Sequence, residues 1–220
     1  MALIARESGG GGTFVSVPPG MYLARCYRIV DLGKQKSEWQ GKVSEQPKVM
    51  LQFEVHGEDE AGKALVTAKG EPMSISKNFT LSLAEKATLR KDLQTWRGQP
   101  FTPEELQGFQ IDNVLGAWAM IAVTKEVGNN GKDYTNIANI NKVPREMKAN
   151  LPEGHNKCAA FYIENPDMDM FATFSDNLRA KIEKSPEWQG RKNVDYQKEQ
   201  NASAKSKGSG FDDMDDDIPF

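Results

Sequence analysis

A strict two-residue alternation in the stretch "KVMLQFEVHG", residues 48–57, constrains the fold more than any other feature of the sequence. Apolar side chains occupy every second position: Val49, Leu51, Phe53 and Val55. The intervening positions form a more polar face that ends at Glu54 and His56. Because successive side chains of a β-strand point to opposite faces, this period predicts a strand with one buried face.

Two further strands are predicted near this one. Residues 21–30, "MYLARCYRIV", are rich in aromatic and β-branched side chains, which favour a strand. Residues 75–81 form a third strand after a loop punctuated by glycines. The polar stretch 31–47, which separates the first two strands, is predicted to be a loop.

Two helices are predicted after the third strand. Ser82 and Glu85 have the spacing of a capping box, and Gly98 supplies a stop. Between them lies an apolar stripe at helical spacing, which consists of Leu89, Leu93 and Trp96. A short second helix follows, and its expected boundary residues are Thr102 as cap, Pro103 at the first position, Glu105 closing the box and Gly108 at the end.

A hairpin completes the expected core. Residues 117–127 and 133–143 flank the step from Asn130 to Gly131, which favours a tight two-residue turn. The order is therefore three strands, a helix and two strands, which is the order of an OB-fold barrel. We expect a mainly β domain over residues 21–145: a five-stranded OB-fold barrel with a helix between strands 3 and 4.

Four segments lie outside the expected barrel. Residues 146–189 include a short helix near 175–184 and are expected to pack on the barrel as a C-terminal helical appendage. Residues 1–20 form a glycine-rich leader and the approach to the first strand. Residues 190–210 have almost nothing apolar to bury, which predicts a disordered linker, and residues 211–220 form an acidic tip.

The distribution of charge separates the body of the chain from the tip. The chain carries 28 bases and 31 acids, but five of the acids fall within the last ten residues. Residues 1–210 therefore carry 28 bases against 26 acids. A mildly basic body with an acidic tail suits a protein whose partner is a polyanion and whose tail competes for the same surface.

Several classes of protein are not expected. No apolar run approaches the roughly 18 residues of a membrane span, and the start "MALIARESGGGG" has too short an apolar stretch for a signal peptide, so we expect a cytoplasmic protein. Cys26 and Cys158 are then expected to stay reduced and to act as small buried fillers. His155 and Cys158 are the only close pair of soft ligands, so we expect neither a metal nor another cofactor. No catalytic constellation is present, which argues against an enzyme.

The tip poses a separate question, because a solvated tail has no need of Ile218, Pro219 and Phe220. The closing stretch "MDDDIPF" closely resembles the C-terminal tip of bacterial single-stranded DNA-binding proteins (SSBs). The internal stretches "SISKNFTLSLAEKATLRKDLQTWRGQPFTPEEL" and "GKDYTNIANI" are similar to SSB-like proteins of phages and prophages, some of them labelled as replication initiation proteins. The long helical region and the appendage depart from the pattern of the housekeeping bacterial proteins.

The resemblance implies that the tip docks on replication, recombination and repair proteins. Ile218 and Phe220 would supply an apolar plug, and the terminal carboxylate would pair with a basic residue beside a pocket. The aspartates would steer the tip towards a basic rim. The expected protein-interaction residues are Asp215, Asp216, Asp217, Ile218, Pro219 and Phe220. A merely solubilising tail is the alternative, and it leaves the apolar residues unexplained.

Binding of a single strand without sequence preference needs cations for phosphates and flat rings for bases. An OB-fold presents them on its second and third strands and on the loops that join strands 1 to 2 and 4 to 5. The residues expected to bind DNA are Arg25, Tyr27, Lys34, Lys36, Trp39, Lys42, Lys77, Lys125, Lys132 and Tyr134. Cross-strand packing is an equal alternative for Tyr134, and Trp118 fits either the core or the interface.

The expected function is sequence-independent binding and protection of single-stranded DNA in phage or bacterial replication, recombination and repair. The tip would recruit partner enzymes, in the cytoplasm of the bacterial host if a phage encodes the protein. The alternative is a replication-initiation or recombination-mediator adaptor that loads another factor and binds DNA weakly. A metal-dependent nuclease is a third reading, against which the missing acid cluster argues. The sequence leaves homo-oligomerisation open.

Overall fold

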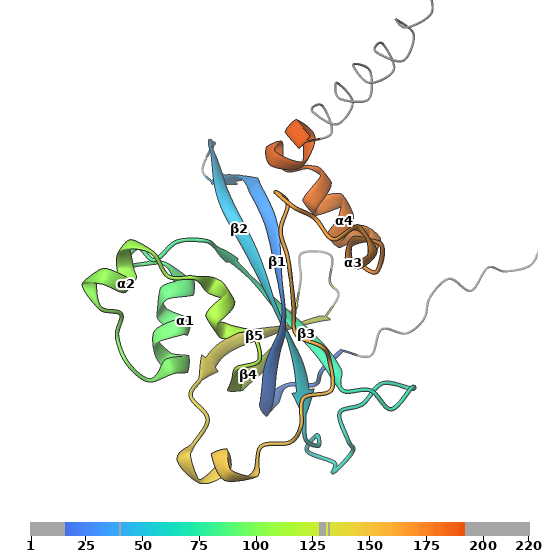
Figure 1. Cartoon of the computed structure of the whole chain (residues 1–220). Helices are drawn as coiled ribbons and strands as arrows, with labels where there is room; N and C mark the ends of the chain where they lie inside the picture. The colour runs from blue at the N-terminus through green and yellow to red at the C-terminus, as the bar shows by residue number, and fades with distance from the viewer. Residues whose placement is uncertain (1–15, 40, 128–130, 132, 192–220) are drawn as a thin grey trace, which may run out of the picture. The chain divides into compact units, whose positions relative to one another are not determined.

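The structure is a computed structural model that describes residues 16–39, 41–127, 131 and 133–191, without the side chains of residues 37–39 and 42. Residues 1–15 of the predicted leader lie outside the described residues. So do nearly all of the predicted linker and the whole of the predicted tip. The described chain is mainly β, with few helices (Figure 1).

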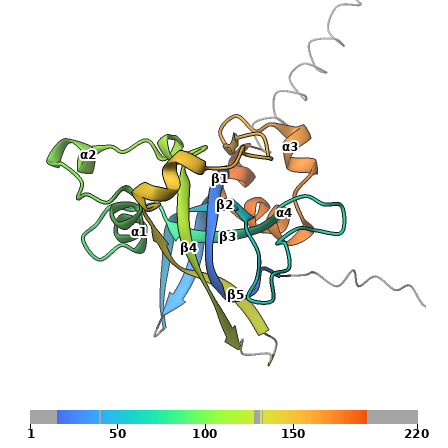
Figure 2. The ribbon, with the colours of Figure 1, turned by 90° about the horizontal axis from the view of Figure 1, so that it is seen from below.

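The strands of the described residues form one six-stranded sheet. They are β1 (Gly20–Trp39), β2 (Lys42–His56), β3 (Met73–Thr80), β4 (Trp118–Val127), β5 (Asp133–Asn141) and β6 (Ala159–Phe161). Hydrogen bonds connect them in the order β3-β2-β1-β4-β5, and β6 pairs with β1. The β1–β4 and β4–β5 pairs are antiparallel, and Figure 2 shows β1 between β2 and β4. Residues of β3 also contact residues of β5, so the two end strands of this order approach each other.

The helical segments confirm part of the prediction and correct part of it. They are α1 (Thr88–Arg97), α2 (Pro103–Gln107), α3 (Met168–Ala172), α4 (Asp176–Glu183) and two 3-10 turns, η1 (Ile111–Val114) and η2 (Arg145–Asn150). The predicted capping box at Ser82 is wrong, because α1 begins after Ala87, whose side chain makes no capping bond. The Ser82 hydroxyl instead accepts the N–H of Ala84 in a local turn, a use of serine that competes with helix formation.

The ends of the first two helices otherwise follow their sequence signals. Gly98 ends α1 in the left-handed conformation, with φ of 73°. The capping box of α2 is present as predicted: the Thr102 hydroxyl accepts the Glu105 N–H, and the Glu105 carboxylate accepts the Thr102 N–H. The sequence therefore located α2 correctly and placed the start of α1 five residues too early.

Contacts divide the chain into two compact units. The first unit comprises the residues up to Val30 together with Val49–Ala160. The second unit comprises Asp31–Lys48 and the residues from Phe161 onward. The strands β1 and β2 contribute residues to both units.

The first unit holds the apolar core that the alternation predicts. The four alternating residues of β2 are buried, namely Val49, Leu51, Phe53 and Val55. The predicted stripe of α1 is also buried, and its Trp96 ring packs against Phe53 with ring centroids 5.5 Å apart. The predicted hairpin of β4 and β5 is confirmed by their antiparallel pairing, although Asn130 lies outside the described residues.

The prediction of a loop over residues 31–47 is wrong. The β1 strand continues to Trp39 and β2 begins at Lys42, so this polar stretch is the outer part of a long hairpin. Tertiary contacts within the second unit stabilise it. The Asp31 carboxylate accepts the N–H groups of Gly33 and Ile163, at 2.8 and 3.3 Å. Gly33 has φ of 63°, and a Cβ at this position would lie 2.5 Å from Ser185, so only glycine fits between hairpin and helix end.

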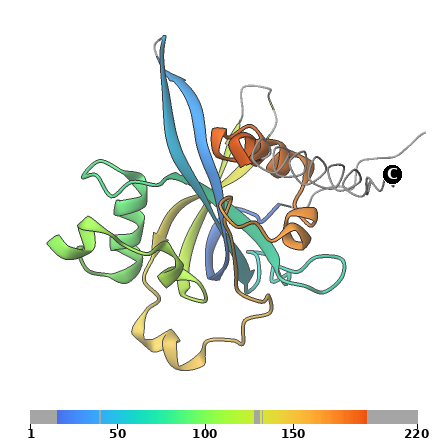
Figure 3. The same ribbon diagram turned by 45° about the horizontal axis from the view of Figure 1, so that its top comes forward.

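The C-terminal part of the second unit, whose ribbon is orange in Figure 3, includes α3 and α4 and has an aromatic core. Phe161 packs against Phe171 and Phe174, and the ring of Phe171 stacks on Trp188 with centroids 4.6 Å apart. The helix predicted near residues 175–184 is confirmed as α4, which Ser175 caps. No helix among the described residues has both the length and the apolar character needed to cross a membrane.

Candidate nucleic-acid interface

The outer part of the β1–β2 hairpin presents two of the predicted DNA-binding lysines. We call residues 31–39 and 42–48 the basic hairpin. Lys36 is 73% exposed, and its Nζ lies 3.4 Å from Oε1 of Glu45. Lys34 is also largely exposed and lies 3.9 Å from a carboxylate oxygen of Glu187. Exposed pairs of this kind contribute only about 0–1 kcal/mol, so a phosphate can replace the carboxylate at little cost. The side chains of Trp39 and Lys42 lie outside the described part.

A half-buried lysine of α4 adds a cation beside the basic hairpin. The backbone oxygen of Lys181 accepts the Gln35 side-chain amide at 3.0 Å, which fixes α4 against the hairpin within the second unit. Burial lowers the pKa of Lys181, and the positive charge of Lys48 lowers it further. An anion bound near these two ammonium groups would relieve their repulsion. Lys181 is not recognisable from the sequence as a member of this group, because only the fold brings α4 to the hairpin.

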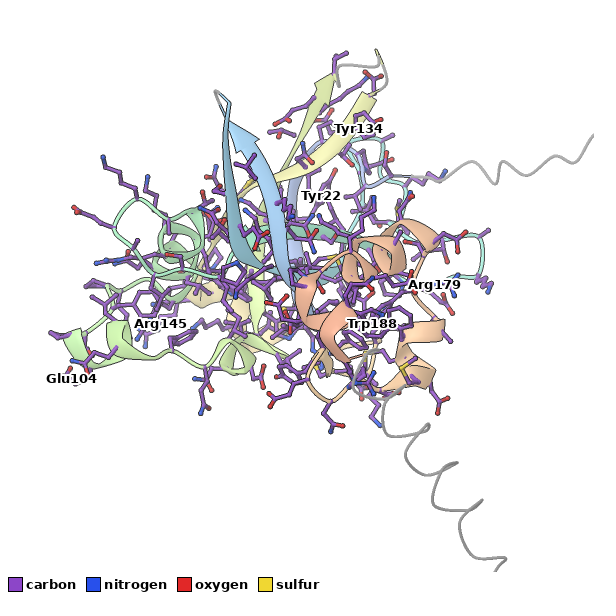
Figure 4. All side chains as sticks on the ribbon, turned by 90° about the horizontal axis from the view of Figure 1, so that it is seen from above. Tyr22, Glu104, Tyr134, Arg145, Arg179 and Trp188 are labelled. Atoms are coloured by element: carbon purple, nitrogen blue, oxygen red, sulfur yellow. The ribbon has the colours of Figure 1, made fainter. Side chains whose placement is uncertain are left out.

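The β4–β5 hairpin carries the next two predicted residues on opposite faces. Tyr134 is 46% exposed and pairs in register with Glu126, near the turn end of the hairpin (Figure 4). Lys125 pairs in register with Thr135 and forms an ion pair with Asp133 at 2.7 Å. Because neighbouring residues of a strand face opposite sides, one stretch of DNA on one face of this hairpin cannot contact both. Lys132 lies outside the described residues.

Lys77 is engaged inside the first unit. Its Nζ donates to Oδ2 of Asp92 at 2.6 Å and to the backbone oxygen of Ala138 at 3.1 Å. The Lys77 side chain is only 17% exposed, and its ammonium group also lies over the Phe79 ring. Lys77 therefore links β3 to α1 and β5, and in this conformation it has little surface to offer a phosphate.

Arg25 and Tyr27, which were predicted to face DNA, are also occupied by internal contacts. The Tyr27 ring is buried, and its hydroxyl lies 3.2 Å from Oγ of Ser74. The Arg25 guanidinium group donates to the backbone oxygen of Asn156 at 3.1 Å and to Sγ of Cys158 at 3.0 Å. Neither residue offers an exposed group for a base or a phosphate in this conformation.

These contacts centre on Glu54, whose position in the alternation predicted a place on the polar face of its strand. Its side chain is fully buried, and its carboxylate accepts the N–H of His155 at 3.0 Å and both the backbone and side-chain N–H groups of Asn156 at 2.7 Å. Nη1 of Arg25 and Nε2 of His56 each lie 3.3 Å from Oε1 of Glu54. We call residues 154–158, which this carboxylate holds against β1 and β2, the strap.

Electrostatics and packing both hold the strap in place. Burial by itself would raise the pKa of Glu54, but the hydrogen bonds from Asn156, His56 and His155 outweigh it, so the pKa is lowered. At Gly154 a Cβ would lie 1.8 Å from Nη1 of Arg25, so the close approach requires glycine. The strap therefore lies against the β1–β2 face that carries Arg25, where DNA was predicted to bind.

Within the described residues, no group of three or more histidine, cysteine, aspartate or glutamate side chains gathers as a metal ion would require. The predicted protein-interaction residues, from Asp215 to Phe220, lie outside the described residues. No protein-family model matches the chain, and no curated protein matches it either.

Proposed function

We propose that this protein binds single-stranded DNA without sequence preference through an OB-fold barrel. An OB-fold is a partly open, five-stranded Greek-key barrel. The order β3-β2-β1-β4-β5, the contact between β3 and β5, and the position of α1 between β3 and β4 along the chain all support this assignment. The protein acts as a binding protein of phage or bacterial DNA replication, recombination and repair rather than as an enzyme.

The exposed cations of the β1–β2 and β4–β5 connections carry the proposal. OB-folds bind nucleic acid through these two connections and through the face of strands 2 and 3. The first connection presents Lys34 and Lys36, and the second presents Lys125 on one face and Tyr134 on the other. Among the described residues, each of the three lysines pairs with an exposed carboxylate, which a phosphate can replace.

The tip gives the proposed protein its second activity. Asp215–Asp217 followed by Ile218–Phe220 combine negative charge with apolar side chains, as a peptide that docks on basic-rimmed pockets requires. In this proposal the tip recruits replication, recombination and repair proteins to the coated strand. A substitution of Ile218 and Phe220 by alanine would then abolish partner binding while the affinity for DNA stays equal or rises.

A fluorescence titration tests the proposal. Labelled poly-dT and a duplex of equal length are titrated with the intact protein at two salt concentrations. We expect a strong preference for the single strand, and an affinity that falls with salt by about 0.7 logarithmic units per phosphate contact for each tenfold rise in salt. Lys34→Glu/Lys36→Glu should flatten this salt slope by about 1.4. The matched control is Lys63→Glu/Lys69→Glu, because both lysines are exposed on the loop before β3.

Two results count against the proposal. An affinity that does not depend on salt would exclude phosphate contacts as its source. A preference for a defined duplex over random single strands would favour the replication-initiation or recombination-mediator adaptor instead.

A further inference from the structure

A pocket of about 610 Å³ opens in the first unit, and its lining residues are not among those proposed to bind DNA. Parts of α1, η1, β4 and η2 surround it. The lining is largely apolar and includes Leu93, Trp96, Phe109, Val114, Trp118 and Leu151. Sites for small molecules are mainly apolar pockets of about 300–1,000 Å³, in which a few polar groups orient the ligand. The pocket has the size and the wall of such a site.

Each aromatic ring of the wall is held by a further contact. The Trp96 indole N–H donates to the backbone oxygen of Trp118 at 2.8 Å. The Trp118 ring packs against His56, with ring centroids 5.0 Å apart. The Phe109 ring meets that of Phe101 edge to face, with centroids 5.2 Å apart. Rings that are fixed in advance lose little conformational entropy when a ligand binds, and they favour a flat aromatic ligand, which can stack on them or meet them edge to face.

The pocket also has a one-sided charge. Arg97, Lys142 and Lys148 are among its lining residues, whereas no aspartate or glutamate of the described chain lines it. The charge of Arg97 is balanced by a two-pronged ion pair with Glu105, at 2.7 and 3.0 Å. The two lysine ammonium groups have no such carboxylate partner among the described residues. The pocket therefore combines an aromatic wall with two uncompensated positive charges.

Gly98 shows that one of these lysines has a definite place. A Cβ at Gly98 would lie 2.6 Å from Cδ of Lys142, so the lysine stem packs over the left-handed residue that ends α1. The backbone N–H of Lys142 donates to the backbone oxygen of Thr95 at 3.2 Å. The rim at this end of the pocket is therefore held by backbone as well as by side-chain packing.

We infer that this pocket binds a small aromatic anion, which is a flat ring system that carries a phosphate or a carboxylate group. The ring system packs against Trp118 and Phe109, and the anionic group pairs with Lys142 and Lys148. Lysine suits either anionic group, because its ammonium is a compact point charge on a flexible stem and does not require a two-pronged partner. An aromatic anion therefore satisfies both halves of the pocket at once.

Other kinds of ligand fit the pocket less well. A neutral apolar molecule would leave both lysine charges without a counter-charge. A single strand of DNA needs a continuous track of cations and ring faces exposed for stacking. Here Trp96 is only 6% exposed, and the two unpaired lysines lie at one concave site rather than along a track. The inference does not depend on DNA binding, because the pocket shares no residue with the proposed DNA interface.

Binding at this site has a consequence for stability. The ligand contacts α1, η1, β4 and η2, which are far apart in the sequence and all belong to the first unit. A ligand that binds only the folded chain stabilises it progressively as the ligand concentration rises above the dissociation constant. The unfolding midpoint of the unmodified chain should therefore rise with the concentration of the anion.

A matched pair of fluorescent dyes tests the inference on the full chain. Anilinonaphthalene sulfonate is a small aromatic anion, and phenylnaphthylamine has the same rings without the sulfonate group. Lys142→Gln/Lys148→Gln should weaken binding of the sulfonate dye by about fivefold or more and leave the affinity for the uncharged dye unchanged, because only the anion pairs with the lysines. Both lysines are exposed, so the substitution should not impair folding. The control pair Lys63→Gln/Lys69→Gln, exposed on the loop before β3, should leave both affinities unchanged.

Competition against the bound sulfonate dye distinguishes the two anionic groups. Deoxyadenosine monophosphate is an aromatic phosphate, and indoleacetate is an aromatic carboxylate. We expect at least one of them to displace the dye, and to do so at lower concentration than its uncharged counterpart, deoxyadenosine or indole. In NMR spectra of the full chain, the competing anion should shift the indole N–H resonances of Trp96 and Trp118 and leave that of Trp188 in place.

Four results would overturn the inference. In the first, neither anion displaces the dye. In the second, Lys142→Gln/Lys148→Gln weakens the binding of both dyes equally, so that charge plays no part. In the third, the Trp188 resonance shifts and those of Trp96 and Trp118 do not. In the fourth, poly-dT displaces the sulfonate dye and the same substitution weakens poly-dT binding, because the pocket would then be a nucleic-acid site.

The two proposals can fail separately. Normal poly-dT binding without binding of either aromatic anion rejects this inference alone and leaves the proposed function standing. Binding of an aromatic anion without any poly-dT binding rejects the proposed function and leaves this inference standing.

Discussion

Replacing Glu54 by glutamine should destabilise the first unit strongly, although the substitution changes almost no volume. The carboxylate is fully buried and accepts three N–H groups from the strap at 2.7–3.0 Å, in addition to its contacts with Arg25 and His56. Glutamine keeps one acceptor oxygen but replaces the other by an NH₂ group, which would face N–H donors. It also removes the negative charge that is paired with the Arg25 side chain.

The size of the effect follows from these contacts. A hydrogen bond to a charged group contributes about 1.5–3 kcal/mol, and removing one member of a buried ion pair costs about 3–5 kcal/mol. Because glutamine retains one acceptor, we expect the lower end of the second range, about 3 kcal/mol. For a protein of 150–250 residues this corresponds to a fall in Tm of about 6–12 °C.

Thermal and urea unfolding, followed by tryptophan fluorescence and far-UV circular dichroism, measure the effect. Glu71→Gln is the matched control, since Glu71 is exposed and its substitution should change stability by less than about 0.5 kcal/mol. Equal unfolding midpoints for Glu54→Gln and Glu71→Gln would refute the reasoning, because the buried carboxylate would then contribute nothing to stability. Faster hydrogen exchange at residues 154–158 in Glu54→Gln than in Glu71→Gln would show that the destabilisation begins at the strap.

Three further predictions follow from the same contacts. The stability that Glu54 provides should be fully present above its ordinary carboxyl pKa of 4.5. It should be lost as the pH falls through the lowered pKa of Glu54 in the folded protein. The unfolding midpoints of the unmodified chain and of Glu54→Gln should therefore converge in acid. Gly154→Ala should cost about 1–3 kcal/mol in urea unfolding, because its Cβ would collide with an Arg25 side chain that is held by three other groups. Asp92→Asn should lower stability by about 2 kcal/mol in the same assay, because Asp92 pairs with Lys77 inside the first unit. The affinity for poly-dT should stay within twofold of that of the unmodified chain. A large loss of DNA affinity would contradict a purely structural role of Lys77.

Patterns that depend on near neighbours in the chain predicted the structure best. The alternation of β2, the apolar stripe of α1 and the capping box of α2 involve residues at most seven positions apart, and all three are present. The prediction for the start of α1 was wrong, also for a local reason. The Ser82 hydroxyl accepts a hydrogen bond from the nearby N–H of Ala84 instead of capping the helix. Two local signals competed there, and the sequence alone does not rank them.

Features that depend on distant residues were missed. The stretch 31–47 has the composition of a loop, but contacts with Ile163, Lys181 and Ser185 make it a hairpin. Glu54 has the appearance of a solvated residue on a polar face, and its partners His155 and Asn156 lie about 100 positions later in the chain. No periodicity connects such residues, so only the fold identifies them.

The same limit governs the candidate DNA-binding residues, because a lysine in a sequence does not reveal its partner. Lys36 and Lys77 both have a carboxylate within 4 Å, yet the two pairs have different consequences. The exposed ion pair of Lys36 contributes at most about 1 kcal/mol to stability. A phosphate can therefore displace Glu45, whose carboxylate is then hydrated again. Displacing Asp92 from Lys77 would leave a mostly buried carboxylate without its cation, at a cost of several kcal/mol. Substitution of Lys36 should therefore act on DNA affinity, and substitution of Lys77 on stability.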